Sequence, residues 1–432
     1  METTDRRRLG AYDAAVRDIR HVRIFHDPNR YAGHVNRGGI WNFGDGELAV
    51  AHRVKAADYR NADWLAPGAH DFSHLPAGAT SGILLNRSLD DGRTWPESEK
   101  AWIWNNERST DELLEWLRPR EPDQRERIDL SDGDAIMHFS PAGEHLRWPL
   151  GGALRPQLAP EGNFHLGKRP PMTMPTFCLR SSDRGRTWER HPTLIEGPSI
   201  SPDTGLLVAN LGHVAFDNGV IGIVGTTNHR NISCFYVSYD NGISWEYVSV
   251  VARGMAGDPD AGYTYMGVHR LPDGRLMTCM HRMSENWPCV AFSADDGMSW
   301  SEPRYVVSPA THCPLDTDDP PQAPLDRGEP RYRSPCALVT RGGRIVIVFA
   351  RRSVGGPRGI LGVASDDLGE TWSREFVLRG DSYTWDCGYP VMTELNDGRL
   401  FTAYYITAHD GGEPVPEYAV VRQVDGTFFR LD

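Results

Sequence analysis

The chain has 432 residues and a formal net charge of −12, and hydrophobic residues make up 39% of it. That composition allows a packed core, and the negative charge argues against a nucleic-acid partner, because phosphate binding needs a basic surface. No run of about eighteen apolar residues suggests a membrane span. The opening METTDRRRLG lacks the apolar stretch of a secretion signal, and the seven cysteines show no CxxC spacing. Both features predict a cytoplasmic protein with reduced thiols.

A short motif, Ser-x-Asp-x-Gly-x-Thr/Ser-Trp, occurs five times along the chain. Its copies begin at Ser88, Ser181, Ser238, Ser293 and Ser365. In each copy the Asp can accept hydrogen bonds from backbone N–H groups of its own turn, and the Gly supplies the positive φ that a tight hairpin needs. The Trp can then pack between neighbouring strands. The repeat therefore predicts five similar strand–turn–strand units.

A second series of turns alternates with this motif. These turns separate pairs of apolar runs at Asp45-Gly46, Asn218-Gly219, Asp273-Gly274, Gly342-Gly343 and Asp397-Gly398, with a weaker one near Ala142-Gly143. Together the two series predict blades of four antiparallel strands, A to D, with a glycine turn between A and B and the repeated motif between C and D.

The chain thus reads as one all-β domain over residues 1–432, a six-bladed β-propeller. The predicted blades span roughly 22–100, 101–194, 195–250, 251–305, 306–377 and 378–432. We expect the N-terminal strand around His21–Phe25 to close the ring. Two segments interrupt the pattern: 108–128, which predicts a short helix with Leu113, Leu114 and Leu117 on one side, and 309–333, which predicts a long functional loop.

The repeated motif resembles the Asp box of the sialidase, or neuraminidase, superfamily, and the resemblance covers most of the chain. It implies a propeller in which the boxes are structural rather than catalytic. Asp boxes also occur in propellers of other activity, including ulvan lyases and enzymes that cleave rhamnose–glucuronate linkages. The resemblance therefore implies a fold before it implies a function.

Strand direction predicts which face of the propeller binds a ligand. The A–B turns and the Asp boxes share one face, called here the Asp-box face. The B–C loops and the D–A crossings form the other, called here the mouth face, and loops on a rigid scaffold are where binding residues concentrate. Arginine forks suit carboxylates, so cations at these positions predict an acidic ligand. The predicted substrate-binding residues are Arg37, Arg53, His229, Arg230, His281, Arg282, Arg331, Arg333 and Arg351.

Two tyrosines extend the resemblance. Tyr389 lies six residues before Leu395, and its stretch CGYPVMTELNDGRL resembles the one that carries the nucleophilic tyrosine of sialidases. Tyr265 has the same spacing to Leu271, where a sialidase would place the glutamate that activates that tyrosine.

The arginines agree with sialidases only in part. Arg282 resembles one of the three sialidase arginines, and Arg331 or Arg333 another. Around Arg37 the sequence reads HVNRGGIW, without the F/Y-R-I-P motif of the first.

The first predicted blade offers two histidines. His34 and His52 are expected at the mouth ends of strands A and B, so that their rings could meet across the pocket; propeller lyases and rhamnose–glucuronate enzymes resemble this in using histidines on that face. A lyase needs His or Tyr to take the proton α to a uronate carboxylate while Arg neutralises that carboxylate. A hydrolase needs an acid for the leaving oxygen. The carboxylates considered for that role are Asp58, Asp63, Asp71, Asp132, Asp134 and Asp386.

The sequence therefore leads to a first hypothesis with two alternatives. The first is an exo-acting glycosidase on oligosaccharides that contain uronate or sialate. The alternatives are a lyase acting by β-elimination and a non-catalytic glycan-binding propeller. The predicted catalytic residues are His34, His52, Tyr265, Tyr389 and Asp386.

Neither a metal nor a cofactor is predicted, because the cluster of His70, Asp71 and His74 lacks a recognised ligand spacing. The sequence leaves the oligomeric state open, a homo-oligomer included.

Overall fold

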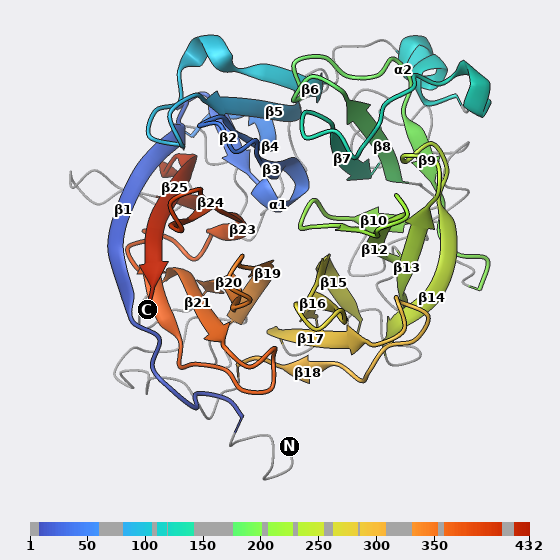
Figure 1. Cartoon of the computed structure of the whole chain (residues 1–432). Coiled ribbons are helices and arrows are strands. Elements are labelled where there is room, and N and C mark those ends of the chain that lie inside the picture. Colours follow the sequence, from blue (N-terminus) through green and yellow to red (C-terminus); the bar gives the residue numbers. More distant parts are fainter. Residues whose placement is uncertain are drawn as a thin grey trace, which may run out of the picture.

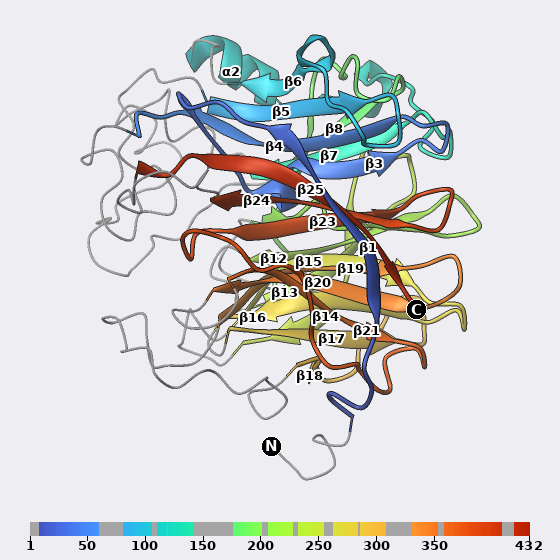
Figure 2. The ribbon, with the colours of Figure 1, turned by 90° about the vertical axis from the view of Figure 1, so that its left-hand side faces the viewer.

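The structure, a computed structural model, has six antiparallel sheets arranged in a ring, a six-bladed β-propeller as predicted (Figure 1). It describes residues 8–59, 81–105, 110–118, 120–141, 176–200, 206–227, 232–254, 262–283, 286–307, 331–352, 358–407 and 419–432. Seen from the side, the strands run from one face of the ring to the other (Figure 2). No helix within these residues is both long and apolar enough to cross a membrane.

The first three sheets are built from strands that follow one another from the axis to the rim. Blade one has β2 (Arg30–Gly33), β3 (Gly39–Asn42), β4 (Leu48–Ala56), β5 (Ser81–Ser88) and β6 (Ala101–Asn105). Blade two has β7 (Ile136–Pro141), β8 (Thr176–Ser181) and β9 (Thr193–Ile195). Blade three has β10 (Leu206–Val208), β11 (Val214–Ala215), β12 (Ile221–Thr227), β13 (Ile232–Ser238) and β14 (Glu246–Arg253).

The other three sheets each have four strands. Blade four has β15 (Tyr263–Arg270), β16 (Leu276–Arg282), β17 (Trp287–Ser293) and β18 (Arg304–Tyr305). Blade five has β19 (Arg331–Val339), β20 (Ile345–Arg352), β21 (Gly359–Ser365) and β22 (Phe376–Arg379). Blade six has β23 (Gly388–Glu394), β24 (Leu400–Thr407), β25 (Arg422–Leu431) and β1 (Val16–Phe25). The structure thus places residues 101–105 in blade one, whereas the sequence had suggested blade two.

The ring is closed by the N-terminal strand, as predicted. β1 pairs antiparallel with β25, with Arg20 opposite Phe428 and Val22 opposite Gly426. Before β1, the chain lies against the Asp-box turn of blade five, where Trp372 N donates to Arg8 O at 2.7 Å and Ala11 N donates to Trp372 O at 2.9 Å. The first described residues therefore join blades five and six before blade one begins.

The core lies between adjacent blades. Because both surfaces of each sheet face another sheet, the middle strands contain continuous apolar runs rather than an alternation of apolar and polar residues. All eight residues of β20, IVIVFARR, are buried. Its valines belong to a cluster with blade six and its isoleucines to a cluster with blade four. Ordered packing on both sides makes each blade a rigid support for its loops.

The five Asp-box turns share one hydrogen-bond pattern. In blade one, Gly92 N donates to Ser88 Oγ at 2.9 Å, and Thr94 donates from its backbone N–H and its hydroxyl to the two oxygens of Asp90 at 2.8 and 2.7 Å. The other four boxes repeat these contacts. Each box is therefore a self-contained corner that fixes the C–D turn.

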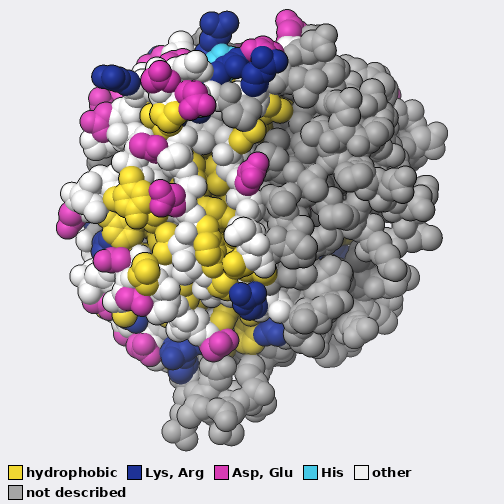
Figure 3. All heavy atoms as spheres, turned by 90° about the vertical axis from the view of Figure 1, so that its right-hand side faces the viewer, with side chains coloured by type: hydrophobic (Ala, Val, Ile, Leu, Met, Phe, Trp, Pro, Cys, Tyr) yellow, Lys and Arg dark blue, Asp and Glu magenta, His cyan; other side chains and the backbone are white. Residues whose placement is uncertain are grey.

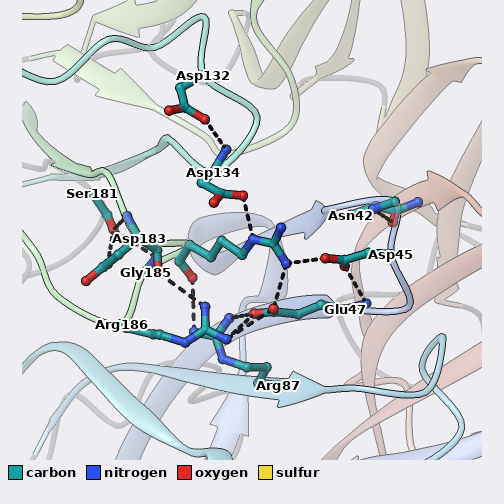
Figure 4. Close-up of polar contacts among 12 residues, drawn as sticks. Asn42, Asp45, Glu47, Arg87, Asp132, Asp134, Ser181, Asp183, Gly185 and Arg186 are labelled. Carbon is teal, nitrogen blue, oxygen red and sulfur yellow. Dashed lines mark hydrogen bonds and ion pairs between the residues drawn. The ribbon is translucent and has the colours of Figure 1, made fainter.

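An ion-pair network joins blades one and two on the Asp-box face (Figure 4). Arg184, within the second Asp box, binds Asp45 at 2.6 Å, Glu47 at 2.9 Å and Asp134 at 2.6 Å. Burial alone would raise the pKa of Glu47, but Arg186, Arg184 and Arg87 outweigh it and lower that pKa. Asp134, considered above for the mouth, thus lies on the opposite face, because the turn that contains Asp132 precedes β7 rather than following it.

Two helices depart from the blade pattern, one between blades one and two and one within blade one. Helix α2 (Thr110–Leu117) forms where a short helix was predicted, and Trp116 from it packs 5.1 Å from Phe177 of β8. The weak turn near Ala142-Gly143 and residues 309–330 of the predicted loop 309–333 lie outside the described residues, whereas residues 331–333 begin strand β19 instead of continuing the loop. A four-residue helix, α1 (Val35–Gly38), separates β2 from β3 at the axis.

The rim of the ring presents the outer strands. On the side that carries β13 and β14, hydrophobic side chains gather in a band with acidic and basic side chains at its margins (Figure 3). Tyr247 of β14 is one of the exposed hydrophobic residues, and Glu246 and Arg253 at the strand's two ends are also exposed. Charges at the ends of an edge strand discourage pairing with another chain.

Candidate active site

Four blades interrupt their innermost strand near the mouth with a residue in the left-handed region. These residues are His34 (φ 51°), Tyr265 (φ 54°), Ser334 (φ 54°) and Tyr389 (φ 52°). In blades four, five and six the strand register shifts at the same points, and in blade one α1 lies there. Positive φ is uncommon for residues other than glycine, and β-bulges re-aim side chains beside functional sites. The bulges therefore turn four side chains away from the regular alternation at one level of the ring.

Three of these side chains meet. The hydroxyl oxygens of Tyr265 and Tyr389 are 3.1 Å apart, and their rings cross edge to face at 5.2 Å. The imidazole of His34 stacks on the ring of Tyr389 at 4.5 Å, with 24° between the planes. Their exposed fractions are 6–7%. Blades one, four and six thus bring a phenol pair and an imidazole together, and Tyr265 and Tyr389 are called here the tyrosine pair.

Burial sets the protonation of this cluster. Burial and the neighbouring Tyr265 raise the pKa of Tyr389 to about 12, against the lowering effect of Arg352 and Arg333. Burial, followed by the charges of Arg37, Arg53 and Lys55, holds the pKa of His34 well below its ordinary value, against the opposing effect of Asp386. At neutral pH the cluster therefore has a protonated phenol beside a neutral imidazole, which is a proton donor beside a proton acceptor.

Two further tyrosines, Tyr31 and Tyr405, contact His34 and Tyr389. The hydroxyl of Tyr31 lies 3.1 Å from Nδ1 of His34. The ring of Tyr405 stacks on Tyr389 at 5.7 Å and lies parallel to His34 at 6.2 Å, with 3° between the planes. Sequence reasoning missed both tyrosines, although Tyr405 stands in β24, LFTAYYIT, next to the strand that carries Tyr389.

Asp386 lies beside the cluster but is engaged. One carboxylate oxygen accepts a hydrogen bond from the hydroxyl of Tyr405, and the other accepts one from Nε of Arg422 at 3.0 Å. Only 3% of its surface is exposed. This arrangement suits the orientation of Tyr405 and Arg422 rather than proton donation to a substrate, which was the role considered from the sequence.

Several predicted cations surround the cluster. Arg37 and Arg53 are buried on blade one, and their charges act on His34. Arg333 is half-buried next to the bulge of blade five, and its charge acts on Tyr389. His281 is buried and its ring faces Tyr265 at 6.0 Å. These three arginines therefore act on the cluster, with the buried carboxylate of Asp386 opposing their effect on His34.

Other predicted residues point elsewhere. His52 does not meet His34; its ring lies 4.8 Å from Phe25 of β1, and burial lowers its pKa to about 3. The reason is the bulge, which turns His34 toward Tyr389 while His52 keeps the regular alternation of β4. Arg282 donates to the hydroxyl of Tyr305 on the outer strand at 2.8 Å. Arg351 lies near Tyr332, on the blade-four side of β20.

Most of the remaining predictions fall outside the described part of the chain. They concern His229, Arg230, the side chain of Arg331, Asp63, and the cluster of His70, Asp71 and His74, whereas Asp58 is described and lies half-buried just after β4. Within the described residues, no group of three or more His, Cys, Asp or Glu side chains is placed to hold a metal ion.

Arg352 was missed in favour of its neighbour Arg351. Its guanidinium donates from Nη2 to the hydroxyl of Tyr405 at 2.8 Å and from Nε to the carbonyl of Cys387 at 2.9 Å. Consecutive strand residues point to opposite sheet surfaces, so only one of the two arginines can face blade six. This alternation could be inferred from the sequence, but the sequence does not show which of the two arginines faces blade six.

The fold and this cluster define a β-propeller with a polar, aromatic-lined site at its axis. The family model described as "BNR repeat-like domain" matches residues 164–402, more than half of the chain, and the chain belongs to this family. No curated protein matches the chain.

Solved structures show the same fold. A protein of unknown function from Dyadobacter fermentans is 19% identical, with a TM-score of 0.64, over 96% of this chain and 99% of its own. The Hadza microbial sialidase Hz136 is 18% identical (TM-score 0.52), over 91% of this chain and 64% of its own. The Trypanosoma rangeli sialidase, solved with the inhibitor DANA, is 13% identical (TM-score 0.53), over 96% of this chain and 60% of its own. This chain thus spans less than two thirds of either sialidase.

Proposed function

We propose that the protein is a carbohydrate-active enzyme that cleaves a terminal linkage in an acidic oligosaccharide, as an exo-glycosidase. The observation that carries the proposal is the tyrosine pair, with hydroxyls 3.1 Å apart and His34 stacked on Tyr389. The charges of Arg37 and Arg53 act on His34 and that of Arg333 acts on Tyr389, and guanidinium groups suit a sugar carboxylate. The fold shared with two sialidases supports the same class of substrate.

A second candidate, β-elimination at a uronate, has one observation in its favour. Tyr265, rather than a carboxylate, faces Tyr389, and the pKa of Tyr389 is raised to about 12. A phenol that keeps its proton is a better acid than nucleophile. In an elimination, a base such as His34 would take the proton α to the carboxylate, the C–O bond to the leaving sugar would break, and Tyr389 would give its proton to the leaving oxygen.

An intracellular setting is part of the proposal. Six cysteines within the described residues are buried free thiols, which a reducing compartment allows.

The first test compares acidic oligosaccharides with their carboxyl-reduced counterparts. We expect turnover of substrates that end in uronate or sialate and little or none of the reduced forms. Released reducing ends report either reaction, whereas new near-ultraviolet absorbance reports only the unsaturated uronate of an elimination. A protein that binds these sugars but releases no product would instead be the glycan-binding propeller.

The matching variant is Tyr389→Phe, which removes one hydroxyl and keeps the stacked ring. We expect activity to fall by about 10²–10⁴-fold, the range for loss of an acid–base group. Tyr239→Phe is the control, because Tyr239 is 66% exposed and follows the third Asp-box serine, on the opposite face. Equal activity of the two variants would remove Tyr389 from the reaction.

A further inference from the structure

The guanidinium of Arg352 lies beside the ring of Tyr389, one member of the tyrosine pair. Arg352 ends β20 and is 5% exposed. Its Cζ is 5.3 Å from the centre of the Tyr389 ring and 5.6 Å from that of Trp385. Its two hydrogen bonds, to the Tyr405 hydroxyl and to the Cys387 carbonyl, fix the plane of the guanidinium. Blade five thus holds a cation in place against the inner strands of blade six.

This cation has no carboxylate of its own. Among the residues that the structure describes, none places a carboxylate within ion-pair distance of Arg352. Asp386 reaches it only through Tyr405, whose hydroxyl accepts from Arg352 and donates to Asp386. Burial alone would lower the pKa of Arg352, but Tyr405, Tyr389 and Asp386 raise it, so the group stays charged. Burying an unpaired charge is costly, and such a cost points to a need for positive charge at this place.

The backbone at Gly388 makes room for the arginine. Gly388 has φ 122°, and a Cβ there would overlap with the Cβ of Ala350 and lie 3.9 Å from Nη2 of Arg352. Because glycine has no Cβ, β20 can press against the start of β23, one residue before Tyr389. The close contact between β20 and β23, which places Arg352 near Tyr389, therefore depends on Ala350 in one strand and Gly388 in the other.

We infer that Arg352 is a positioning residue that holds the ring of Tyr389 and stabilises negative charge on its phenol oxygen when the hydroxyl proton leaves. The inference rests on the proposed function in that Tyr389 is taken as a reacting group. It holds for both candidate reactions. If Tyr389 attacks a sugar, a base such as His34 takes its proton, and the oxygen's electron pair forms the new C–O bond as the bond to the leaving sugar breaks. If Tyr389 protonates a leaving oxygen, its proton moves to that oxygen and the electron pair remains on the phenolate. In both reactions the O–H bond breaks and negative charge develops on the phenol oxygen.

The other groups that face Tyr389 divide into two kinds. Tyr265, His34 and Tyr405 are uncharged neighbours at neutral pH. Arg333 and Arg352 are the cations that lower the pKa of Tyr389. Arg333 is half-buried and its charge is open to screening by solvent, whereas Arg352 is buried and fixed by two hydrogen bonds. Arg352 is therefore the cation whose removal should change Tyr389 most.

The test is an alkaline titration of the phenols, followed by near-ultraviolet absorbance of the phenolate. Arg352→Met is made both with Tyr389 present and in a Tyr389→Phe background. We expect one phenol to titrate about one pH unit or more higher in the Met variant, a tenfold or greater loss of phenolate at a given pH. The shift should vanish in the Phe background and be smaller in Arg352→Lys, which keeps the charge but not the planar fork. If the Met variant fails to fold, Arg352→Gln carries the same expectation.

Kinetics provide a second readout. With an active substrate, the Met variant should lose about tenfold or more in kcat with KM little changed, because a positioning residue acts in the transition state rather than on ground-state binding. The control is Arg379→Gln on the outer strand β22, where Arg379 binds Asp381 and Asp425. It should lower stability but leave the titration of Tyr389 as in the parent.

Two results would overturn the inference. One is a titration in the Met variant that matches the parent. The other is a raised KM with unchanged kcat, which would make Arg352 a substrate ligand. Because the titration needs no substrate, inactivity of the parent on acidic sugars would count against the proposed function while leaving this test intact.

Discussion

At the scale of single residues, burial governs the chemistry of the site more than the choice of side chain does. His34 is an ordinary histidine in sequence, but its position between Tyr389, Tyr31 and three nearby cations depresses its pKa well below the usual range. His52 and His138, also fully buried, have pKa values lowered to about 3 and about 4, chiefly by burial. The folded protein therefore holds several imidazoles in the neutral form.

This has a consequence for stability. Below about pH 6.5 the unfolded chain protonates these histidines while the folded chain does not. The free energy of unfolding should therefore fall as pH is lowered from 6.5 toward the folded pKa values. In denaturant titrations between pH 7 and 5, His34→Asn and His138→Asn should each flatten this dependence by up to about 1.4 kcal/mol per pH unit.

The control for that measurement is Asn86→Ala. Asn86 is a buried, non-titrating residue of β5 whose Nδ2 donates to Val50 O at 3.2 Å. Its loss should lower stability equally at all these pH values. A His34 variant with the slope of the parent would show that the imidazole binds its proton as readily in the folded protein as in the unfolded chain.

The residues of the site were only partly predictable, because which of two consecutive strand residues faces the site depends on how the strand alternates between its two surfaces. Tyr265 and Tyr389 lie together in the structure, and both have the same spacing to a glycine turn and the same bulge. His52 and Arg351 were expected at the mouth on their position alone. The structure turns the first toward Phe25 and selects Arg352 over the second, and neither outcome follows from the identity of the residue.

At the scale of elements, the turns were predictable and the bulges were not. A glycine turn or an Asp box has a fixed chemistry, so the C–D and A–B corners could be found from their residues. A left-handed histidine, serine or tyrosine has no such signature, because tertiary packing imposes it. In blade two the sequence also failed to locate a turn. The turn was expected near Ala142, but the structure has one before β7, at Asp132 and Asp134.

The contact between β20 and β23 allows an element-scale test at Gly388. Gly388→Ala adds a methyl group that overlaps with Ala350, so β23 must move away from β20 and carry Tyr389 with it. We expect at least a tenfold loss of activity and a stability cost of about 1–3 kcal/mol from backbone strain. Activity and thermal unfolding measured side by side would check both.

Gly398→Ala is the matched control. Gly398 also has a positive φ, 79°, but it lies in the A–B turn, where an added Cβ meets only the end of the Arg430 side chain at 3.6 Å. This variant should show a backbone cost of similar size with activity retained. Equal loss of activity in both variants would mean that strain in general, and not the β20–β23 contact, disturbs the site.

At the scale of the whole molecule, the number of blades and the means of closure followed from the repeat. Five blades have an Asp box between their last two strands, and the sixth blade has none. Its fourth strand therefore comes from elsewhere in the chain, and β1 provides it by pairing with β25. The second attachment, from Arg8 and Ala11 to the Asp-box turn of blade five, had no sequence signal, because backbone hydrogen bonds do not depend on side-chain identity.

Ring closure predicts the effect of shortening the chain. Removal of residues 1–26 deletes β1, exposes the length of β25 and opens the ring, so we expect a loss of several kcal/mol in stability and a tendency to aggregate through the open edge. Removal of residues 1–7 alone leaves β1 and the contacts of Arg8 in place and should melt like the full chain. Thermal melting with light scattering would separate the two, and a stable, monomeric protein lacking β1 would contradict the closure by this strand.

The pairing of β1 with β25 also bears on synthesis in the cell. β1 ends at Phe25 and β25 begins at Arg422, so the edge of β1 stays unmatched while the strands between them are translated. Five blades can form in order as they emerge, but the axial cluster draws on blades one, four and six. A chain that stops before β23 would therefore have neither a closed ring nor the tyrosine pair, since it would lack both β25 and Tyr389.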